Sequence, residues 1–358
     1  MSDRPGFLFV TCQIGAETAV KQELATQWPG FHFAYSRPGF LTFKLPADRS
    51  LRPDLDLRSV FARAWAFSLG KVTGSDPDQM ARGVWQVYTA RPPRRLHVWQ
   101  RDAVRPGEDG FTSPVTEVTR EAAARILACC PYPERLADNA ADPCHPAKPG
   151  EDVLDCVLVQ PNEWWVGQHQ ASAVPSLWPG GAICLELPPD AVSRAWLKME
   201  EGLRWSNLPI PAGARCAELG SAPGGASQAL LSRGIIVTGI DPAEMHPAVL
   251  AHPRFRHIRH RASQVRRREF RKIRWLMADM NVAPNYTLDA VESLVTHPEV
   301  HIRGMLLTLK LVRWGLADQL PQYLQRIRDW GFNVVRARQL LYNRQEICVA
   351  ALKKPFVR

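Results

Sequence analysis

The 358-residue sequence lacks several patterns that would each define a class of protein. No apolar run reaches the roughly 18 residues that a membrane-spanning helix needs. The first six residues, Met-Ser-Asp-Arg-Pro-Gly, do not have the basic and then apolar layout of a signal peptide. The eight cysteines include no Cys-x-x-Cys pair, so we expect neither a zinc site nor a disulfide framework. These absences predict a cytoplasmic protein without a bound metal.

A Gly-x-Gly-x-x-Gly motif, which binds the pyrophosphate of dinucleotides, is also missing. In its place, residues 215–241 predict a strand that ends at Leu219, a glycine loop at 220–225, a helix over 226–232 and a second strand that leads to Asp241. This order is that of the nucleotide-binding half of a doubly wound sheet. Asp241 stands where a carboxylate can accept both ribose hydroxyls of a bound nucleoside.

The glycine loop favours S-adenosylmethionine over a dinucleotide. Gly224 and Gly225 let the backbone approach a ligand closely, because neither carries a Cβ atom. Pro223 removes one of the backbone N–H donors that a pyrophosphate needs at the start of a helix. S-adenosylmethionine carries no phosphate, so fewer donors are enough for it.

Positive charge is concentrated in one segment. Residues 254–274, which we call the basic run, contain ten Lys or Arg and one acid, Glu269, so they hold +9 of the net charge of +10. Such a run is typical of a surface that binds a polyanion. A solvated arginine-rich face is the alternative, and we favour RNA.

The hydrophobic pattern divides the chain into two parts. Residues 1–70 predict a small α+β unit of ferredoxin-like type, with strands at 7–11, 32–36 and 40–44 and helices at 16–27 and 57–66. A helix at 79–89, a strand at 95–100, a helix at 116–129 and paired strands at 152–160 and 163–168 follow. Six Pro or Gly residues mark 171–192 as a linker.

The second part predicts a mostly parallel sheet. Ser193 is expected to cap a helix at 194–204. Later strands are expected at 255–259, 275–278 and 305–309, helices at 286–296 and 316–330, and a closing antiparallel hairpin at 334–339 and 347–352. Strands that alternate with helices indicate an α/β domain over 193–358.

Four charged residues lie at the edges of these apolar segments. They are Lys198 on the first helix, Asp279 and Lys310 after two strands, and Glu346 before the last strand. The carboxyl ends of parallel strands face the ligand crevice in an open α/β sheet. Charged groups there must pair or take part in chemistry, so these four form a candidate catalytic site.

This combination resembles the FtsJ-like ribose 2′-O-methyltransferases. The loop at 220–225 and the four charged residues are similar to the Lys-Asp-Lys-Glu tetrad of that family. Residues 193–201 are similar to a helix motif of the branch that methylates a cytidine of 23S rRNA and carries a THUMP-bearing RNA-binding region. The likeness covers 193–353, and is weaker in the N-terminal part, where it includes Gly15-Ala16-Glu17.

The resemblance implies a fold and a function. The fold is α/β, with a Rossmann-like S-adenosylmethionine-dependent methyltransferase domain at 193–358, preceded by an α+β (ferredoxin-like/THUMP) RNA-binding region whose THUMP-like domain spans 71–170. The function is 2′-O-methylation of ribose in ribosomal RNA. The implied cofactor contacts are Ser193, Gly220, Ala222, Pro223, Gly224, Gly225, Asp241 and Asp279.

The resemblance also implies a role for each charged residue. A ribose hydroxyl is a poor nucleophile until a base accepts its proton, and Lys310 is the implied base. Asp279 orients Lys310 and contacts the amino group of the cofactor, while Glu346 positions the second lysine, Lys198, or the ribose. Charges this close should titrate as one coupled group, and no metal is required.

Two positions depart from the family pattern. Ala226 replaces an aromatic residue after the glycine loop, and the third strand leads to 260–263 without the acid that reads adenine. Other methyltransferase classes fit less well, because the turn at 279–284 has neither the Pro-Pro-aromatic pattern of amino-group enzymes nor the cysteine of cytosine C5 enzymes. An RNA-binding protein without catalysis remains the alternative.

Overall fold

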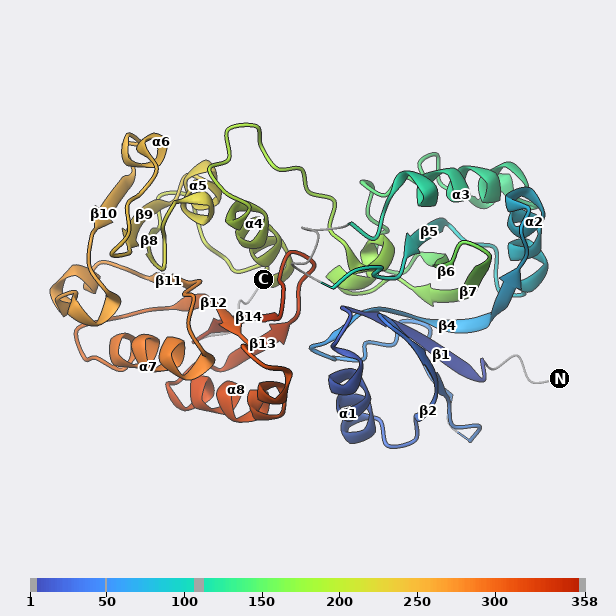
Figure 1. Cartoon of the computed structure of the whole chain (residues 1–358), viewed down its shortest axis with the longest axis horizontal. Coiled ribbons are helices and arrows are strands. Elements are labelled where there is room, and N and C mark those ends of the chain that lie inside the picture. Colours follow the sequence, from blue (N-terminus) through green and yellow to red (C-terminus); the bar gives the residue numbers. More distant parts are fainter. Residues whose placement is uncertain (1–4, 49, 106–112, 354–358) are drawn as a thin grey trace. The chain divides into compact units, whose positions relative to one another are not determined.

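The computed structural model describes residues 5–48, 50–105 and 113–353, and the chain divides into two compact units, Met1–Cys184 and Leu185–Arg358 (Figure 1). The division falls within the stretch 171–192 that the sequence predicts as a linker. Four of the six N-terminal residues considered for a signal peptide lie outside the described residues. Within the described ranges, no helix is long and apolar enough to cross a membrane.

The first unit contains a seven-stranded sheet, whose strands are β1 (Phe7–Cys12), β2 (His32–Arg37), β3 (Phe40–Lys44), β4 (Ala62–Thr73), β5 (Arg95–Gln100), β6 (Asp152–Gln160) and β7 (Glu163–Gln170). Their order across the sheet is β2-β3-β1-β4-β7-β6-β5. Strands β5 and β6 are parallel and the other neighbours are antiparallel. Strand β4 crosses residue 70, so the two domains expected in this region share one sheet.

Among the described residues of this unit, three α-helices accompany the sheet, namely α1 (Glu17–Gln27), α2 (Pro77–Val87) and α3 (Glu117–Ala128). Both α2 and α3 have side-chain N-caps, from Asp76 and Thr116. Their apolar faces pack on strands β5, β6 and β7 through a cluster that includes Val84, Ile126 and Leu154. Short 3-10 helices lie at η1 (Pro133–Arg135), η2 (Val174–Leu177) and η3 (Pro179–Gly181).

The prediction of a helix at 57–66 is wrong. The segment enters strand β4, which pairs with β1 on one side and β7 on the other. Arg58 has a φ of 52°, in the left-handed region that a right-handed helix does not use. Pairing on both edges of the strand outweighs a local spacing that also fits a helix.

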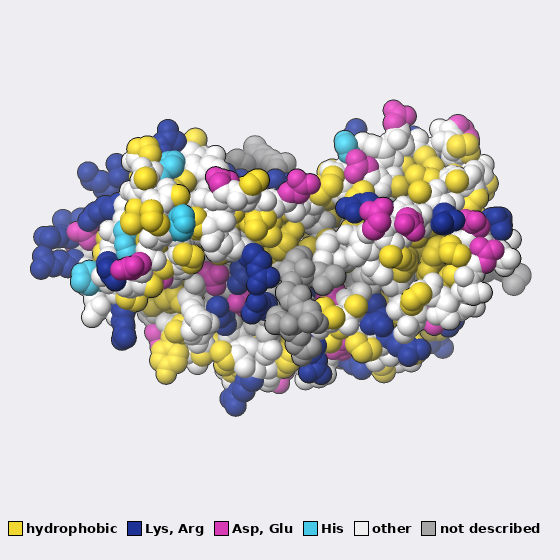
Figure 2. Space-filling view, turned by 45° about the horizontal axis from the view of Figure 1, so that its top comes forward, with side chains coloured by type: hydrophobic (Ala, Val, Ile, Leu, Met, Phe, Trp, Pro, Cys, Tyr) yellow, Lys and Arg dark blue, Asp and Glu magenta, His cyan; other side chains and the backbone are white. Residues whose placement is uncertain are grey.

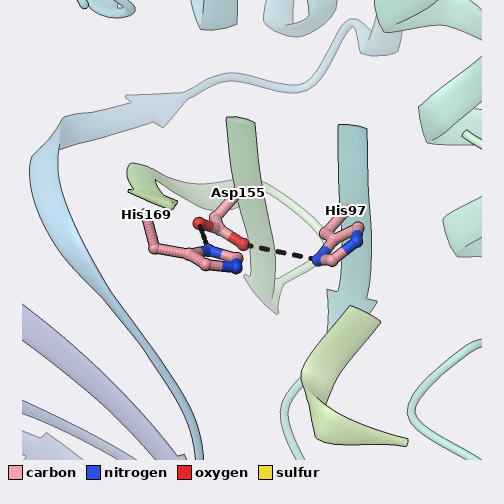
Figure 3. A group of neighbouring side chains, drawn as sticks. All are labelled: His97, Asp155 and His169. Atoms are coloured by element: carbon pink, nitrogen blue, oxygen red, sulfur yellow. Dashed lines mark hydrogen bonds and ion pairs between the residues drawn. The ribbon is translucent and has the colours of Figure 1, made fainter. Parts of the chain in front are cut away.

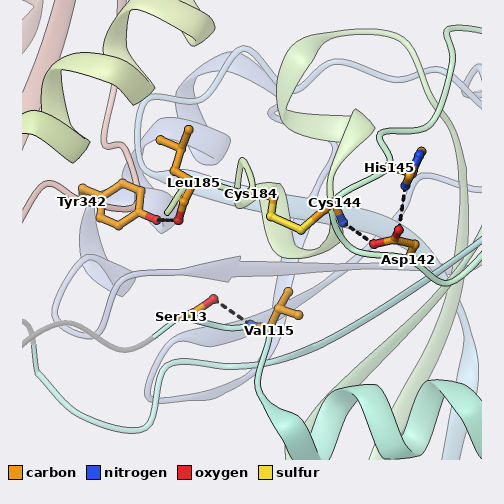
Figure 4. Close-up of a disulfide and its surroundings, with 8 residues drawn as sticks. All are labelled: Ser113, Val115, Asp142, Cys144, His145, Cys184, Leu185 and Tyr342. Carbon is orange, nitrogen blue, oxygen red and sulfur yellow. Dashed lines mark hydrogen bonds and ion pairs between the residues drawn. A yellow bond between two sulfur atoms is a disulfide. The ribbon is translucent and has the colours of Figure 1, made fainter. Parts of the chain in front are cut away.

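The prediction that the cysteines form no disulfide is also wrong. Cys144 and Cys184 are joined by a disulfide at a sequence separation of 40 residues (Figure 4). Cys184 is the last residue of the first unit, so the bond anchors the end of that unit to the loop that follows α3. The carboxylate of Asp142 organises this loop, because it accepts hydrogen bonds from the backbone N–H of Cys144 and pairs with His145.

The second unit contains a second seven-stranded sheet, formed by β8 (Arg215–Leu219), β9 (Ile236–Ile240), β10 (Phe255–Ile258), β11 (Trp275–Ala278), β12 (Gly304–Lys310), β13 (Val334–Arg338) and β14 (Glu346–Leu352). The order is β10-β9-β8-β11-β12-β14-β13. The first five are parallel, and β14 and β13 close the sheet as an antiparallel pair. This confirms the predicted Rossmann-like sheet and its closing hairpin.

The helices of this unit are α4 (Ala195–Ser206), α5 (Gly225–Ser232), α6 (Pro247–Leu250), α7 (Pro284–Val295) and α8 (Leu320–Asp329), with 3-10 helices η4 (Ala262–Gln264), η5 (Arg267–Phe270) and η6 (Trp314–Gln319). The predicted helix at 316–330 therefore begins as a 3-10 helix and becomes α-helical at Leu320. The prediction that Ser193 caps α4 is wrong. Arg194 occupies the N-cap position, and its side chain makes no capping hydrogen bond.

Candidate active site

The glycine loop between β8 and α5 forms a cradle that side chains would fill. Gly220 has a φ of 79°, and a Cβ atom there would lie 2.5 Å from the backbone oxygen of Asp279. Gly224 has a φ of 120° and occupies the N-cap position of α5. A Cβ atom on Gly225 would lie 2.2 Å from Oγ of Ser193. Only glycine therefore fits these positions without displacing backbone or a buried side chain.

Asp241 follows β9 directly and lies beside the same loop. Its Oδ2 accepts a hydrogen bond from the backbone N–H of Ala222 at 3.1 Å, and its Oδ1 accepts one from that of Ala243 at 2.8 Å. The carboxylate thus holds the loop against the end of β9. Each carboxylate oxygen can accept more than one bond, so both keep capacity for the hydroxyls of a ribose.

Two buried polar atoms at this edge of the sheet have no hydrogen-bond partner among the described residues. They are Oγ of Ser193 and Oδ1 of Asp279. Buried polar atoms are nearly always paired. An unpaired hydroxyl and an unpaired carboxylate oxygen beside a glycine cradle fit a ligand that carries both an acceptor and a donor, such as the amino-acid part of S-adenosylmethionine.

The four charged residues predicted from the sequence meet at the carboxyl ends of β11 and β12. Nζ of Lys198 lies 2.6 Å from Oε2 of Glu346 and 3.6 Å from Oδ2 of Asp279. Nζ of Lys310 lies 3.3 Å from Oε1 of Glu346. Lys310 ends β12 and Glu346 begins β14, and the two residues are partners in the antiparallel ladder. We call this group the tetrad.

Burial and mutual attraction oppose each other within the tetrad. Burial alone would lower the pKa of Lys198, but the carboxylates of Asp279 and Glu346 outweigh it and raise the pKa above its usual value. Burial would raise the pKa of Glu346, but Lys198 and Lys310 hold it below the usual value. Burial, with the nearby Glu346, raises the pKa of Asp279 against the effect of Lys198. The protons of Lys198, Asp279 and Glu346 are therefore coupled.

Two further residues contact the tetrad and a third is buried behind the glycine loop, and none of the three was predicted. Asn281 accepts a hydrogen bond from Nζ of Lys310 at 3.2 Å, and Asn343 donates one to Oε2 of Glu346 at 3.5 Å. Glu218 on β8 is buried behind the glycine loop and hydrogen-bonded to Ser227. Burial raises the pKa of Glu218 to about 8. Asn281 lies two residues after Asp279, and that proximity to a strand end is the signal that could have identified it.

The basic run covers β10, η4 and η5, and Figure 2 shows Lys and Arg side chains gathered over this part of the second unit. Several of its arginines pair with acids, such as Arg256 with Glu269 at 2.8 Å. Arg261, Arg266 and Lys272 are exposed, and none of them pairs with an acid within the described part of the chain. The run therefore presents uncompensated positive charge.

The first unit contains a buried group of two histidines and an aspartate (Figure 3). Nδ1 of His169 lies 2.6 Å from Oδ2 of Asp155, and Nε2 of His169 lies 2.8 Å from the carbonyl oxygen of Ser176. A carbonyl only accepts, so Nε2 carries a hydrogen, and another proton lies between Nδ1 and the carboxylate. Burial alone would lower the pKa of His169, but the hydrogen bonds with Asp155 and Ser176 and the charge of Asp155 raise it above the usual value.

The third member of that group, His97, is more distant, with Nδ1 3.9 Å from Oδ1 of Asp155. Burial lowers the pKa of His97, so this ring is neutral. A divalent metal would have to displace the proton that His169 and Asp155 share. We therefore assign the pair a structural role, in which it ties β7 to η2.

Known proteins are similar to the second unit and, in some cases, to nearly the whole chain. Residues 191–320 match the family described as FtsJ-like methyltransferase. The ribosomal RNA large subunit methyltransferase M of Halorhodospira halophila is 33% identical over 180 residues, which are 49% of this chain and 51% of that protein. The match thus spans about half the length of that relative. The protein of the same name from Xanthomonas oryzae pv. oryzae is 29% identical over 361 residues, covering 97% of this chain and 99% of the relative.

Solved structures are more distant. TrmN from Thermus thermophilus is 15% identical and covers 97% of this chain and 99% of its own, with a TM-score of 0.37. The sequence match therefore carries the assignment. Residues 191–320 are thus similar to the FtsJ-like methyltransferase family, and nearly the whole chain is similar to a protein named ribosomal RNA large subunit methyltransferase M.

Proposed function

We propose that the protein transfers a methyl group from S-adenosylmethionine to a ribose 2′-hydroxyl of ribosomal RNA, with a cytidine of 23S rRNA as the target. The observation that carries the proposal is the tetrad. Both lysines contact the carboxylate of Glu346, at 2.6 Å for Nζ of Lys198 and 3.3 Å for Nζ of Lys310. The relatives named ribosomal RNA large subunit methyltransferase M support ribosomal RNA as the substrate class.

The residues present fit the methyl donor. The glycine cradle at 220–225 would receive its amino-acid part, with Ser193, Ala222, Pro223 and the free oxygen of Asp279 around it. Asp241 would accept hydrogen bonds from the ribose of the donor. When bound, S-adenosylmethionine supplies an electrophilic methyl group on a sulfonium.

The residues of the tetrad would prepare the RNA hydroxyl. Lys310, in its neutral form, accepts the proton of the 2′-hydroxyl at Nζ, so the oxygen becomes nucleophilic. Asn281 and Glu346 hold that nitrogen from two directions, at 3.2 and 3.3 Å. Lys198 contacts the carboxylates of both Glu346 and Asp279, so it offsets part of their negative charge while Lys310 is neutral. Fixed positions of base and hydroxyl lower the entropic part of the barrier.

The basic run would hold the RNA. Each phosphate that a Lys or Arg neutralises releases counterions, so binding weakens as salt rises. Replacing Arg266, Arg267 and Arg268 by Gln should weaken binding to 23S rRNA and flatten its dependence on salt. A salt slope equal to that of the parent chain would make the run a solvated face without a role in binding.

The decisive experiment offers labelled S-adenosylmethionine and unmodified 23S rRNA transcript to the full chain. We expect label in RNA, and nucleoside analysis should find it as 2′-O-methylcytidine. Label on a base would contradict the assignment of the tetrad. RNA binding without transfer would favour the RNA-binding protein that lacks catalysis.

A further inference from the structure

Large apolar side chains are exposed around the tetrad. Val282, Tyr286 and Val312 keep 37%, 69% and 66% of their surface exposed, and they are three of the five large exposed apolar residues described in the second unit. Val282 follows Asn281, and Val312 lies two residues after Lys310. Three of these five side chains therefore lie within about five residues of Asn281 or Lys310 in the sequence. Grouped exposure of this kind marks a binding surface.

Two exposed arginines accompany these apolar residues. Arg313 follows Val312, and Arg344 lies two residues before Glu346. A backbone hydrogen bond from Leu311 to Gln345, at 2.9 Å, joins the segments that carry them. Neither guanidinium pairs with a carboxylate among the described residues. We call Val282, Tyr286, Val312, Arg313 and Arg344 the rim.

The charged side chains of the tetrad are less exposed than those of the rim, which lie near them in the sequence. The side chains of Lys310 and Lys198 are each only 22% exposed. A ribose must therefore come into close contact with a largely buried side chain before its 2′-hydroxyl reaches Nζ of Lys310. A nucleotide within a duplex is held by its paired strand and its stacked neighbours, whereas an unpaired nucleotide can turn out of the strand.

The composition of the rim identifies its partner. Exposed aromatic and aliphatic surface binds the faces of bases, and arginine binds phosphates and stacks on bases. In a duplex the base faces are already stacked on one another, so only unpaired nucleotides offer them. We propose that the rim stacks on unpaired nucleotides beside the target ribose, and that the protein acts on single-stranded RNA. This inference rests on the proposed function, because it concerns the substrate of the same site.

Binding tests the rim without any need for catalysis. The full chain is titrated with a 12-nucleotide single-stranded RNA and with the same RNA annealed to its complement. We expect tighter binding of the single strand, and Tyr286→Ala should weaken it roughly 5- to 100-fold, as the loss of one base stack does. Tyr286→Phe keeps the ring and should bind as the parent does, whereas Tyr286→Leu should resemble Tyr286→Ala. Equal binding of the duplex, or no effect of Tyr286→Ala, would overturn the inference.

Methyl transfer tests it a second way. Once the methylated nucleotide of the 23S rRNA transcript is mapped, an oligonucleotide annealed over it should reduce kcat/KM at least about tenfold, while one annealed to a distant stretch should have no effect. Tyr286→Ala should raise KM and leave kcat nearly unchanged. Unchanged transfer to the annealed RNA would overturn the inference and leave the proposed function intact. If no RNA is methylated, the proposed function fails, and the binding titration alone decides whether the rim holds unpaired RNA.

Discussion

Replacing Lys310 by Ala should abolish methyl transfer and leave the binding of S-adenosylmethionine nearly unchanged. A positioned general base contributes about 10²- to 10⁴-fold, which corresponds to about 3 to 5 kcal/mol in the activation free energy. Nζ of Lys310 contacts Glu346 and Asn281 and none of the residues of the glycine loop. The fold should survive, because Glu346 keeps its 2.6 Å contact with Lys198.

The assay separates chemistry from binding. Single-turnover transfer of labelled methyl to 23S rRNA transcript reports the chemical step, and calorimetric titration with S-adenosylmethionine reports the affinity. Residual transfer together with a large loss of cofactor affinity would refute the reasoning, since Lys310 would then be a cofactor ligand.

Lys310→Arg is the matched control. Arginine keeps the positive charge beside Glu346 but cannot lose its proton near neutral pH. We expect this variant to be as inactive as Lys310→Ala. An active Lys310→Arg would mean that the site needs a cation at this position and takes its base from elsewhere.

Three further predictions concern stability. Burial raises the pKa of Glu218 to about 8, so its contribution to stability is complete below the unfolded value of about 4 and is lost as pH rises towards 8. Glu218→Gln should therefore raise the unfolding free energy above about pH 8, by about 5 kcal/mol at most. An unchanged pH profile in thermal unfolding would contradict this. Replacing Cys144 and Cys184 by Ser should lower the unfolding free energy by up to about 4 kcal/mol, because the disulfide joins residues 40 positions apart. In denaturant unfolding, the variant and the reduced parent should have the same unfolding free energy. His169→Gln should lower the unfolding free energy by about 3 kcal/mol below neutral pH. This loss should become smaller as pH rises through the raised pKa of His169. A loss that does not vary with pH would show that the proton on His169 does not contribute to stability.

The parallel strands of the second unit could be predicted because a charged residue in the sequence marks where a strand ends. Strand β11 is fully apolar and is followed by Asp279, and β12 is apolar except for Thr308 and its last residue, Lys310. Charges cannot stay unpaired inside a sheet, so the strand ends and the tetrad members were found together. Both arguments are local, and they do not depend on knowing the partner strand.

Two of the wrong predictions, the helix at 57–66 and the absence of a disulfide, concern segments whose partners are distant in the chain. Local spacing over 57–66 fits a helix and a strand equally, and pairing with β1 and β7 decides between them. Cys144 and Cys184 are brought together only by the packing of the loop after α3 against the end of the first unit. The support given to Lys310 by Asn281 could be located only once β11 and β12 were known to be neighbours.

The direction of β14 explains how an acid near the end of the sequence joins the tetrad. In the antiparallel ladder the first residue of β14, Glu346, lies opposite the last residue of β12, Lys310. A parallel strand in the same place would end there with Leu352 and would leave the lysine without its acid. The reversal of one strand at the edge of the parallel sheet is therefore what supplies the carboxylate that joins the two lysines.

The position of α4 completes the group. Gly202 lies one helical turn after Lys198, on the same face, and a Cβ atom there would lie 2.8 Å from a methyl carbon of Leu306 and 3.4 Å from Sγ of Cys348. The missing side chain lets α4 pack closely over β12 and β14, so Nζ of Lys198 reaches Oε2 of Glu346 at 2.6 Å. Glycine lowers the stability of a helix, and its presence at position 202 is explained by the close packing that Lys198 needs to reach Glu346.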